Sequence, residues 1–325
     1  MQKEMKKQLV VKGGMLESQS SNWKRWQVDL LLILVTLIWG GTFLVVQNSI
    51  KLTGPFSFLA LRFTIGAVAL GIIFRTRLLK ITKWEIISGT IIGVLLFIGY
   101  ALQTVGLQYT TTSKAGFITG MSVVIVPLLS VILLRQIPTL FATFGVIMAA
   151  IGLTLLSLGN GLSLDFGLGE MLLLGCAFSF ALQILAVSRY APGKDAFNLA
   201  IVQVAVTAIL SAISAPLFGE PLVMPSGEVW GAALFMGVVA TGFTFAVMNR
   251  VQQFTSSTRA VLIYSLEPVF AGIFGYLAGE TLSIPAWIGC ALIFAGMISS
   301  ELKFKRRKAE VVRLPEPESE ELAIA

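Results

Sequence analysis

The sequence predicts an all-α integral membrane protein with ten transmembrane helices, built as two inverted five-helix repeats with both termini in the cytoplasm. Three observations predict this class: the composition, the lengths of the apolar stretches, and a repeat between the two halves. Of the 325 residues, 56% are hydrophobic and 13% are charged, and the mean hydropathy is +0.85. A soluble domain has about 45–50% apolar and about 25% charged residues, so the charged share is roughly half the usual one. This composition also excludes an intrinsically disordered chain, which needs low hydrophobicity and high net charge.

The apolar stretches have the length that a membrane requires. A spanning helix needs about 20 mostly apolar residues, because the hydrocarbon core is about 30 Å thick and each residue adds about 1.5 Å. In the first half these stretches are Val28–Val46, Phe56–Phe74, Ile86–Val105, Ala115–Leu134 and Leu140–Leu158. In the second half they are Gly167–Val187, Phe197–Phe218, Val229–Met248, Val261–Ala278 and Ile284–Ser299.

The connections between these stretches are short, which leaves no room for a separate soluble domain. We therefore expect two membrane units at 28–158 and 167–299, between a polar N-terminal tail at 1–27 and a disordered C-terminal tail at 302–325. The first 22 residues lack an apolar core segment, so we expect no cleavable signal peptide.

The basic residues orient the chain. With the N-terminus inside, 21 of the 24 Lys and Arg residues fall on the cytoplasmic side, whereas the outer loops carry only Lys51 and Lys114 and Arg62 lies within a span. The positive-inside rule then predicts that both termini are cytoplasmic, in the bacterial cytoplasmic membrane. The net charge of +7 follows from this topology and from contact with the anionic bilayer surface, so we expect no nucleic-acid partner.

The second half of the chain repeats the first. Pro55–Arg62 aligns with Ala196–Gln203 at an offset of 141, and Tyr109–Ala115 aligns with Phe254–Ala260 at an offset of 145. Because each unit has an odd number of helices, the second unit inserts in the opposite orientation. This is the inverted-repeat plan of secondary transporters, in which the substrate site lies near the midplane where the repeats meet.

Two glycine pairs mark the fifth and tenth spans. Gly145 and Gly152 align with Gly289 and Gly296 at an offset of 144, and in each span the two glycines are seven residues apart. That spacing places them on one face of a helix, where small residues allow another helix to approach closely. We expect such a contact, and a homodimer through the fifth and tenth spans is one form that it could take.

Short elements in a fixed order carry a resemblance to a known family. The elements are Trp39-Gly-Gly-Thr-Phe43, Leu61-Arg62-Phe63, Thr112-Ser-Lys-Ala115, Glu267-Pro268 and Gly279-Glu280-Thr-Leu-Ser283. Over about residues 29–299 the chain resembles the EamA-type, ten-helix members of the drug/metabolite transporter superfamily. The resemblance implies solute export or exchange without ATP, and a central cavity lined by spans one to four and six to nine. The first repeat departs from the pattern, because Arg135-Gln-Ile-Pro-Thr139 stands where the second repeat has Gly-Glu-Thr-Leu-Ser.

Two charged residues lie clearly inside spans, where each costs at least about 2.5–3.5 kcal/mol near the centre. Arg62 is about 9 Å from the outer boundary and Glu267 about 9 Å from the inner one, so the two differ in depth by roughly 12 Å. A simple ion pair between them would need tilted helices or a solute between them. The alternatives are that Arg62 bonds to helix-end carbonyls or extends to the membrane surface, and that Glu267 bonds to the hydroxyl of Ser265 or Tyr264.

Polar and aromatic residues of the spans complete the predicted solute-binding set, with packing between helices as the alternative for each one. The set is Trp39, Thr42, Arg62, Tyr100, Gln103, Thr119, Ser122, Gln183, Gln203, Thr241, Tyr264 and Glu267. Pro127 and Pro268 are expected to kink the fourth and ninth spans.

These features favour a secondary transporter that moves small organic solutes, such as amino acids, metabolites or drug-like compounds, by alternating access and as an exporter. A channel or scaffold is the main alternative. A membrane-embedded enzyme is less favoured, because the loops offer no cluster of acidic, His or Cys side chains. The chain has no histidine, which excludes Ser-His-Asp triads, HExxH zinc sites and His-ligated haem, so we expect no catalytic residue, metal or cofactor. Solute identity, direction, proton coupling and oligomeric state are left open.

Overall fold

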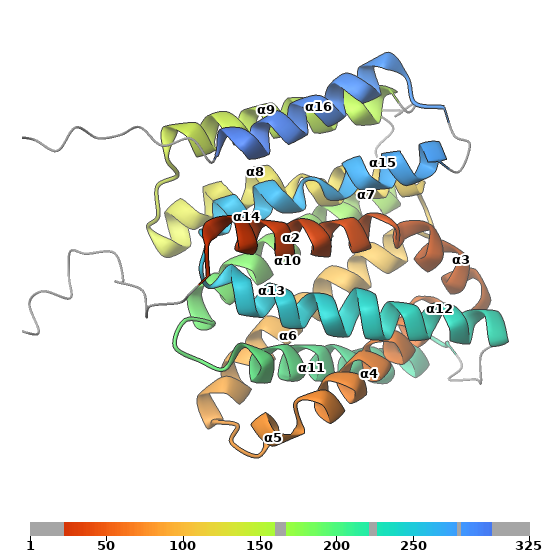
Figure 1. Ribbon diagram of the computed structural model, residues 1–325. Coiled ribbons are helices and arrows are strands. Elements are labelled where there is room, and N and C mark those ends of the chain that lie inside the picture. Colours follow the sequence, from red (N-terminus) through yellow and green to blue (C-terminus); the bar gives the residue numbers. More distant parts are fainter. Residues whose placement is uncertain (1–22, 160–166, 221–225, 278–280, 301–325) are drawn as a thin grey trace, which may run out of the picture.

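A computed structural model describes residues 23–159, 167–220, 226–277 and 281–300, which form a bundle of helices (Figure 1). The predicted disordered tail at 302–325, most of the polar tail at 1–27 and the connection at 160–166 lie outside these residues. Throughout the described part the regular structure is helical, as the composition predicts.

The first repeat contains eight α-helical segments and one π-helical turn. They are α2 (Arg25–Gly40), α3 (Phe43–Thr53), α4 (Pro55–Ile73), α5 (Arg75–Leu78), α6 (Lys83–Gly106), α7 (Thr112–Gly120), α8 (Ser122–Leu129), the π-helical turn η2 (Ser130–Leu134) and α9 (Leu140–Gly159). The second repeat contains α10 (Leu168–Tyr190), α11 (Ala196–Leu217), α12 (Gly227–Gly237), the π-helical turn η3 (Val238–Phe243), α13 (Thr244–Gln252), α14 (Ser257–Tyr264), α15 (Glu267–Leu277) and α16 (Ile284–Ser299).

Within the described residues, eight helices are long and apolar enough to cross a membrane once short interruptions are bridged. The first of them joins α2 to α3, the fourth joins α7 to η2, and the eighth joins α12 to α13. The two remaining predicted spans are less regular, because a turn separates α14 from α15 and because α16 has only 16 residues.

Within the described residues, the two spans that contain Pro268 and Pro127 are interrupted near their middle. The ninth breaks at Ser265 and Leu266, just before Pro268, whose missing N–H leaves the carbonyl of Tyr264 without its usual helical donor. The fourth breaks at Met121, whereas α8 continues through Pro127 and passes into η2. The kink expected at Pro127 stays a prediction, and the helix type of this span changes at Met121 and again at Ser130.

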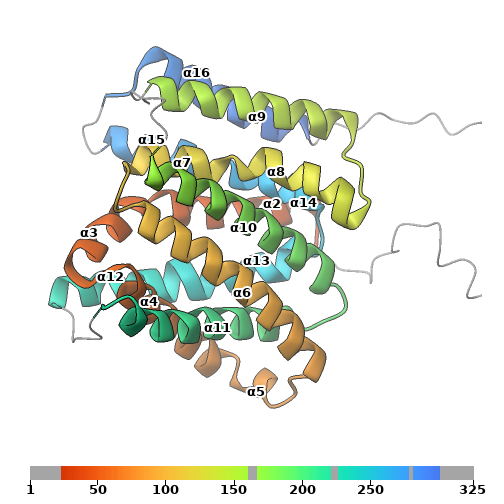
Figure 2. The same ribbon diagram turned by 180° about the vertical axis from the view of Figure 1, so that it is seen from behind.

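Helices α9 and α16 form a close pair along one edge of the bundle, and α4, α6 and α11 lie towards the opposite edge (Figures 1 and 2). A Cβ atom built on Gly289 would lie 2.4 Å from the carbonyl oxygen of Gly152, and one on Gly145 would lie 2.4 Å from that of Gly296. The close glycine contact predicted for the fifth and tenth spans is therefore formed within the chain, between the two repeats.

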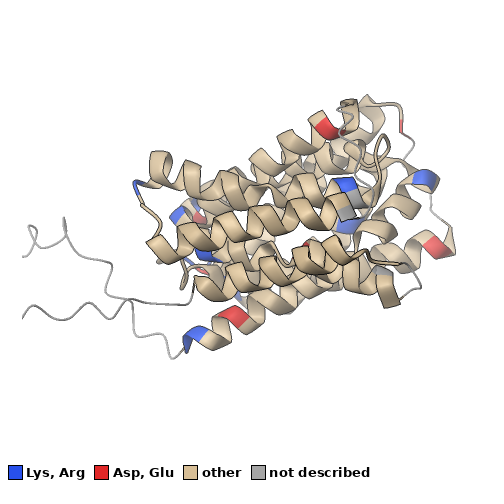
Figure 3. Ribbon diagram, turned by 90° about the horizontal axis from the view of Figure 1, so that it is seen from above, with Lys and Arg blue, Asp and Glu red and all other residues tan. Residues whose placement is uncertain are grey.

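The start of α2 and the end of α16 lie at the same end of the bundle, here called the terminal end (Figure 1). The opposite end, called the far end, carries the junction of α3 with α4 and the start of α7. Most charged residues lie towards these two ends, and the ribbon between them is largely uncharged (Figure 3).

Candidate functional site

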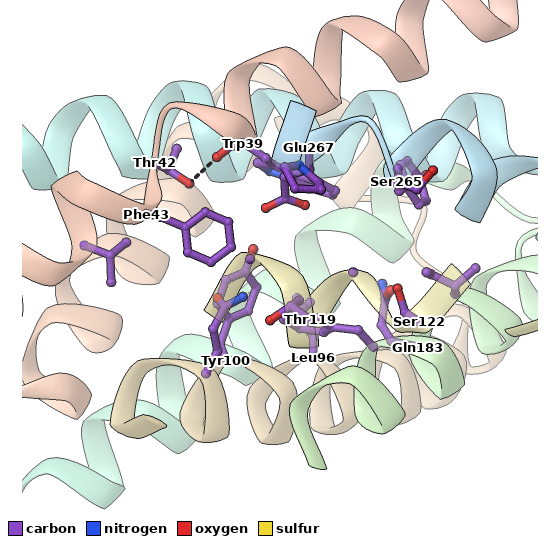
Figure 4. Close-up of a pocket in the computed structure, with 18 of the residues that line it drawn as sticks. Trp39, Thr42, Phe43, Leu96, Tyr100, Thr119, Ser122, Gln183, Ser265 and Glu267 are labelled. Atoms are coloured by element: carbon purple, nitrogen blue, oxygen red, sulfur yellow. Dashed lines mark hydrogen bonds between the residues drawn. The ribbon is translucent and has the colours of Figure 1, made fainter. Parts of the chain in front are cut away.

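A central cavity lies between the two repeats and encloses about 850 Å³ of empty space, its opening included. Trp39, Thr42 and Glu267 lie on one wall, and Tyr100 and Thr119 lie on the wall that faces them (Figure 4). Ten of the twelve residues predicted from the sequence line the cavity: Trp39, Thr42, Arg62, Tyr100, Gln103, Thr119, Ser122, Gln183, Tyr264 and Glu267.

The cavity wall is built from equivalent positions of the two repeats. At the offsets of 141 and 145 found in the sequence, eight lining residues of the first repeat have a partner in the second that also lines the cavity. They are Trp39 with Phe180, Thr42 with Gln183, Phe43 with Ile184, Tyr100 with Phe245, Gln103 with Met248, Thr119 with Tyr264, Gly120 with Ser265, and Ser122 with Glu267. The cavity therefore lies where the symmetry between the repeats brings the same segments together.

Equivalent positions of the two repeats line the cavity, but their side chains differ in charge. Arg62 corresponds to Gln203 in the second repeat, and Glu267 corresponds to Ser122 in the first. Each repeat thus contributes one charged residue, of opposite sign, whose equivalent is neutral.

Arg62 is held by the second repeat. Its side chain is only 2% exposed, its Nε donates to Thr241 Oγ1 at 2.7 Å, and its Nη2 lies 3.4 Å from the carbonyl oxygen of Ala240. The guanidinium carbon is also 4.9 Å from the centre of the Tyr100 ring, a favourable cation–π arrangement. The carbonyl that Arg62 contacts lies inside a π-helical turn and not at a helix end, and the same side chain also lines the cavity.

The π-helical turn η3 supplies that carbonyl. A π-helical turn shifts the backbone out of the regular α-helical hydrogen-bond register and frequently occurs at functional sites. The Ala240 oxygen accepts hydrogen bonds from Trp39 Nε1 at 3.1 Å and from Thr244 Oγ1 at 2.8 Å, in addition to the contact with Arg62. Trp39 and Arg62 of the first repeat are therefore both positioned by one turn of the second.

Glu267 begins α15, and its carboxylate points into the cavity (Figure 4). The two hydroxyls proposed as its structural partners bond elsewhere, because Tyr264 donates to Gln252 Oε1 at 3.2 Å and Ser265 donates to the Leu262 carbonyl at 2.7 Å. Among the described residues, neither Arg62 nor Glu267 takes part in an ion pair. Both charges therefore border the cavity without an ion pair between them.

Two predicted residues lie behind the wall. Gln203 is fully buried and its Oε1 accepts a hydrogen bond from Gln183 Nε2 at 3.3 Å, whereas Thr241 is fully buried and bonds to Arg62. Each of them holds a residue that does line the cavity.

The sequence reasoning missed the apolar part of the wall, which includes Phe43, Phe180, Ile184, Phe245 and Met248. An apolar residue in a membrane span gives no local signal of facing a cavity. The repeat would have supplied the signal for Phe180, Phe245 and Met248, because their equivalents Trp39, Tyr100 and Gln103 were predicted to line the cavity. Phe43 and Ile184 are equivalents of each other, so the repeat carries no signal for these two.

A duplicated bundle of apolar helices around a central polar and aromatic cavity defines a multi-pass membrane protein of the solute-carrying kind. The chain belongs to the EamA-like transporter family, which it matches twice, over residues 26–158 and 167–300. The two matches coincide with the two repeats. The resemblance stated from the short sequence elements is thereby confirmed, and the protein is a transporter.

Relatives from several organisms carry similar names. An uncharacterized transporter of Archaeoglobus fulgidus is 35% identical over 281 residues, which cover 86% of this chain and 87% of the relative. The uncharacterized transporter YoaV of Bacillus subtilis is 28% identical, with 87% of this chain and 99% of the relative covered. A protein crystal structure aligns with a TM-score of 0.72 at 24% identity, over 87% of this chain and 100% of that chain, which supports the fold.

Proposed function

We propose that the protein is a secondary transporter that moves small organic solutes across the bacterial cytoplasmic membrane by alternating access, in the direction of export. The observation that carries this proposal is the cavity, whose lining comes from equivalent positions of both repeats. Two inverted repeats can exchange conformations, which converts a cavity open to one side into a cavity open to the other.

The proposal includes ten spans with both termini in the cytoplasm. The break between α14 and α15 supports a ninth span, because Ser257–Leu277 together would cover about 30 Å at about 1.5 Å per residue. Helix α16 is shorter, but it packs side by side with α9, as a tenth span would. The terminal end carries most of the basic residues and is assigned to the cytoplasm.

We assign solute binding to the twelve predicted residues, of which Gln203 and Thr241 act by positioning Gln183 and Arg62. Opposite charges on Arg62 and Glu267, together with aromatic rings such as Tyr100, favour a solute with both an anionic and a cationic group. Amino acids have this chemistry, as do many zwitterionic metabolites and drug-like compounds. Neither a metal, a cofactor nor a catalytic residue has a role in this proposal.

Counterflow in proteoliposomes tests the carrier function. Vesicles loaded with an unlabelled amino acid mixture should transiently accumulate a radiolabelled amino acid, because only a carrier couples exit to entry. Arg62→Gln reproduces the residue at the equivalent position of the other repeat, so it should fold and mainly weaken solutes with a carboxylate. Uptake without trans-stimulation for amino acids, organic acids and amines alike would favour a channel, and chemical conversion of the label would favour an enzyme.

A homodimer through the fifth and tenth spans stays a prediction. The four glycines already contact each other within the chain, so a second copy would have to contact outward-facing side chains of α9 and α16, such as Phe144, Ile151 and Phe294.

A further inference from the structure

Each end of the bundle carries an ion pair that joins the two repeats. At the far end, Lys114 Nζ of the first repeat lies 3.4 Å from Glu170 Oε1 of the second. At the terminal end, Arg259 of the second repeat donates from Nη2 and Nε to the two carboxylate oxygens of Asp29 of the first, at 2.5 and 3.1 Å. We call these the far pair and the terminal pair.

The two pairs are equivalent under the duplication. Lys114 and Arg259 are separated by the offset of 145, and Asp29 and Glu170 by the offset of 141, the same two offsets that relate the cavity walls. In both pairs a cation at the start of a repeat's fourth span bonds to a carboxylate at the start of the other repeat's first span. An accidental surface contact would have no reason to recur at both offsets.

The two cations, Lys114 and Arg259, lie in the first turns of the short half-helices α7 and α14, which are capped in the same way. Thr111 caps α7 by accepting from the N–H of Lys114, and Ser256 caps α14 by accepting from the N–H of Arg259. Both half-helices stop at equivalent mid-span breaks, after Gly120 in one and at Ser265 in the other. Each half-helix also lines the cavity close to its break, so a displacement about the break would move its cation and open that end of the cavity together.

We propose that the far pair and the terminal pair are the two gates of the cavity, a proposal that rests on the carrier function above. Each pair closes one end, and the transport cycle separates them one at a time. In this structure both pairs are formed.

Ion pairs of this kind suit a reversible gate. The four side chains are between 9% and 19% exposed, so closing a gate removes most of their hydration and opening it restores that hydration. Because the attraction between two desolvated charges is largely offset by the loss of their hydration, such a contact can form and separate without a large difference in free energy.

Side-specific labelling of a cavity cysteine tests the gates. The reporter is Met248→Cys, which lines the cavity and is 1% exposed, in a background with both native cysteines replaced by alanine. Membrane-impermeant maleimide is applied to vesicles of each orientation, with Lys51→Cys marking the far side. Glu170→Gln should raise the labelling rate of the reporter by at least about five-fold from the far side only, and Asp29→Asn should do so from the terminal side only.

Matched variants separate gating from general damage. Arg77→Gln removes a more exposed ion pair with Asp195 and should leave reporter labelling unchanged. The exchange of Asp29→Arg with Arg259→Asp should return labelling towards the parent rate. The charge exchange is made at the terminal pair and not at the far pair, because a basic residue in place of Glu170 would also lose the hydrogen bonds that Glu170 accepts from Thr110 and from the N–H of Gly167.

Unchanged labelling in both single variants, or an equal rise from both sides, would overturn the proposal. Labelling requires no solute, so these outcomes are distinct from a failure of counterflow, which would refute the carrier function instead.

Discussion

Replacing Gly289 by alanine tests the contact that joins the two repeats along one edge of the bundle. The added Cβ would lie 2.4 Å from the carbonyl oxygen of Gly152 and 2.5 Å from the backbone nitrogen of Leu156. Both are backbone atoms, so no side-chain rotation relieves the overlap. Contacts shorter than 3.4 Å are tight for a real Cβ, and α9 and α16 would therefore have to separate by roughly 1 Å to accommodate the methyl group.

Overpacking of this kind typically costs about 1–3 kcal/mol. The entropy of unfolding is about 2.1 cal/mol/K per residue, so a change of 1 kcal/mol shifts the melting temperature of a chain of 325 residues by about 1.5 °C. We therefore expect Gly289→Ala to melt roughly 1.5–4.5 °C lower. The control is Gly231→Ala in α12, where a Cβ would have nothing within 4 Å. Both variants make the same chemical change in a helix, so the difference between their melting temperatures isolates the contact.

The assay is thermal unfolding of the purified protein in detergent at a fixed scan rate, with size-exclusion chromatography of each variant. Equal melting temperatures for Gly289→Ala and Gly231→Ala would refute the close contact between α9 and α16. Dissociation of a dimer without any loss of thermal stability would mean that the glycine-bearing faces of α9 and α16 form a contact between two copies of the chain instead.

Two further predictions concern topology and coupling. A cysteine at Lys51 should react with an impermeant maleimide from outside intact cells and one at Lys80 should not; the reverse pattern would overturn the orientation. Glu267→Gln retains the shape of a protonated carboxyl group, and the native carboxylate points into the cavity with its neighbouring hydroxyls bonded elsewhere. We therefore expect the variant to fold and to retain counterflow but to lose any accumulation driven by a proton gradient, measured in proteoliposomes with an imposed pH difference. If wild type and variant respond equally to the gradient, Glu267 does not couple protons to transport.

Much of the fold follows from local properties of the chain. Within the described residues, eight of the ten predicted spans appear as helices long enough to cross a membrane, because apolar length is a sum over neighbouring residues. The breaks in the fourth and ninth spans could not be foreseen in detail. The turn before Pro268 combines a missing N–H with contacts across the bundle, and the break at Met121 has no local sequence signal of comparable strength.

The sequence predicted which residues belong to the candidate site better than it predicted how they are arranged in space. A polar residue within a membrane span must find a partner, so polarity alone selected Trp39, Arg62 and Glu267. Whether that partner is another helix or a cavity depends on how the helices are rotated about their axes. Thr241 was therefore selected with the others, although it lies behind the wall and bonds to Arg62.

The sequence by itself determined the membrane class, the duplication and the glycine faces, because hydropathy, charge and residue spacing are properties of the chain in one dimension. Only the tertiary structure decided that the glycines of α9 meet those of α16, that η3 offers one carbonyl to both Trp39 and Arg62, and that Lys114 and Arg259 pair with carboxylates of the opposite repeat. These contacts join residues more than fifty positions apart. They depend on which faces of the helices meet across the interface between the repeats, and no local pattern of residues specifies that geometry.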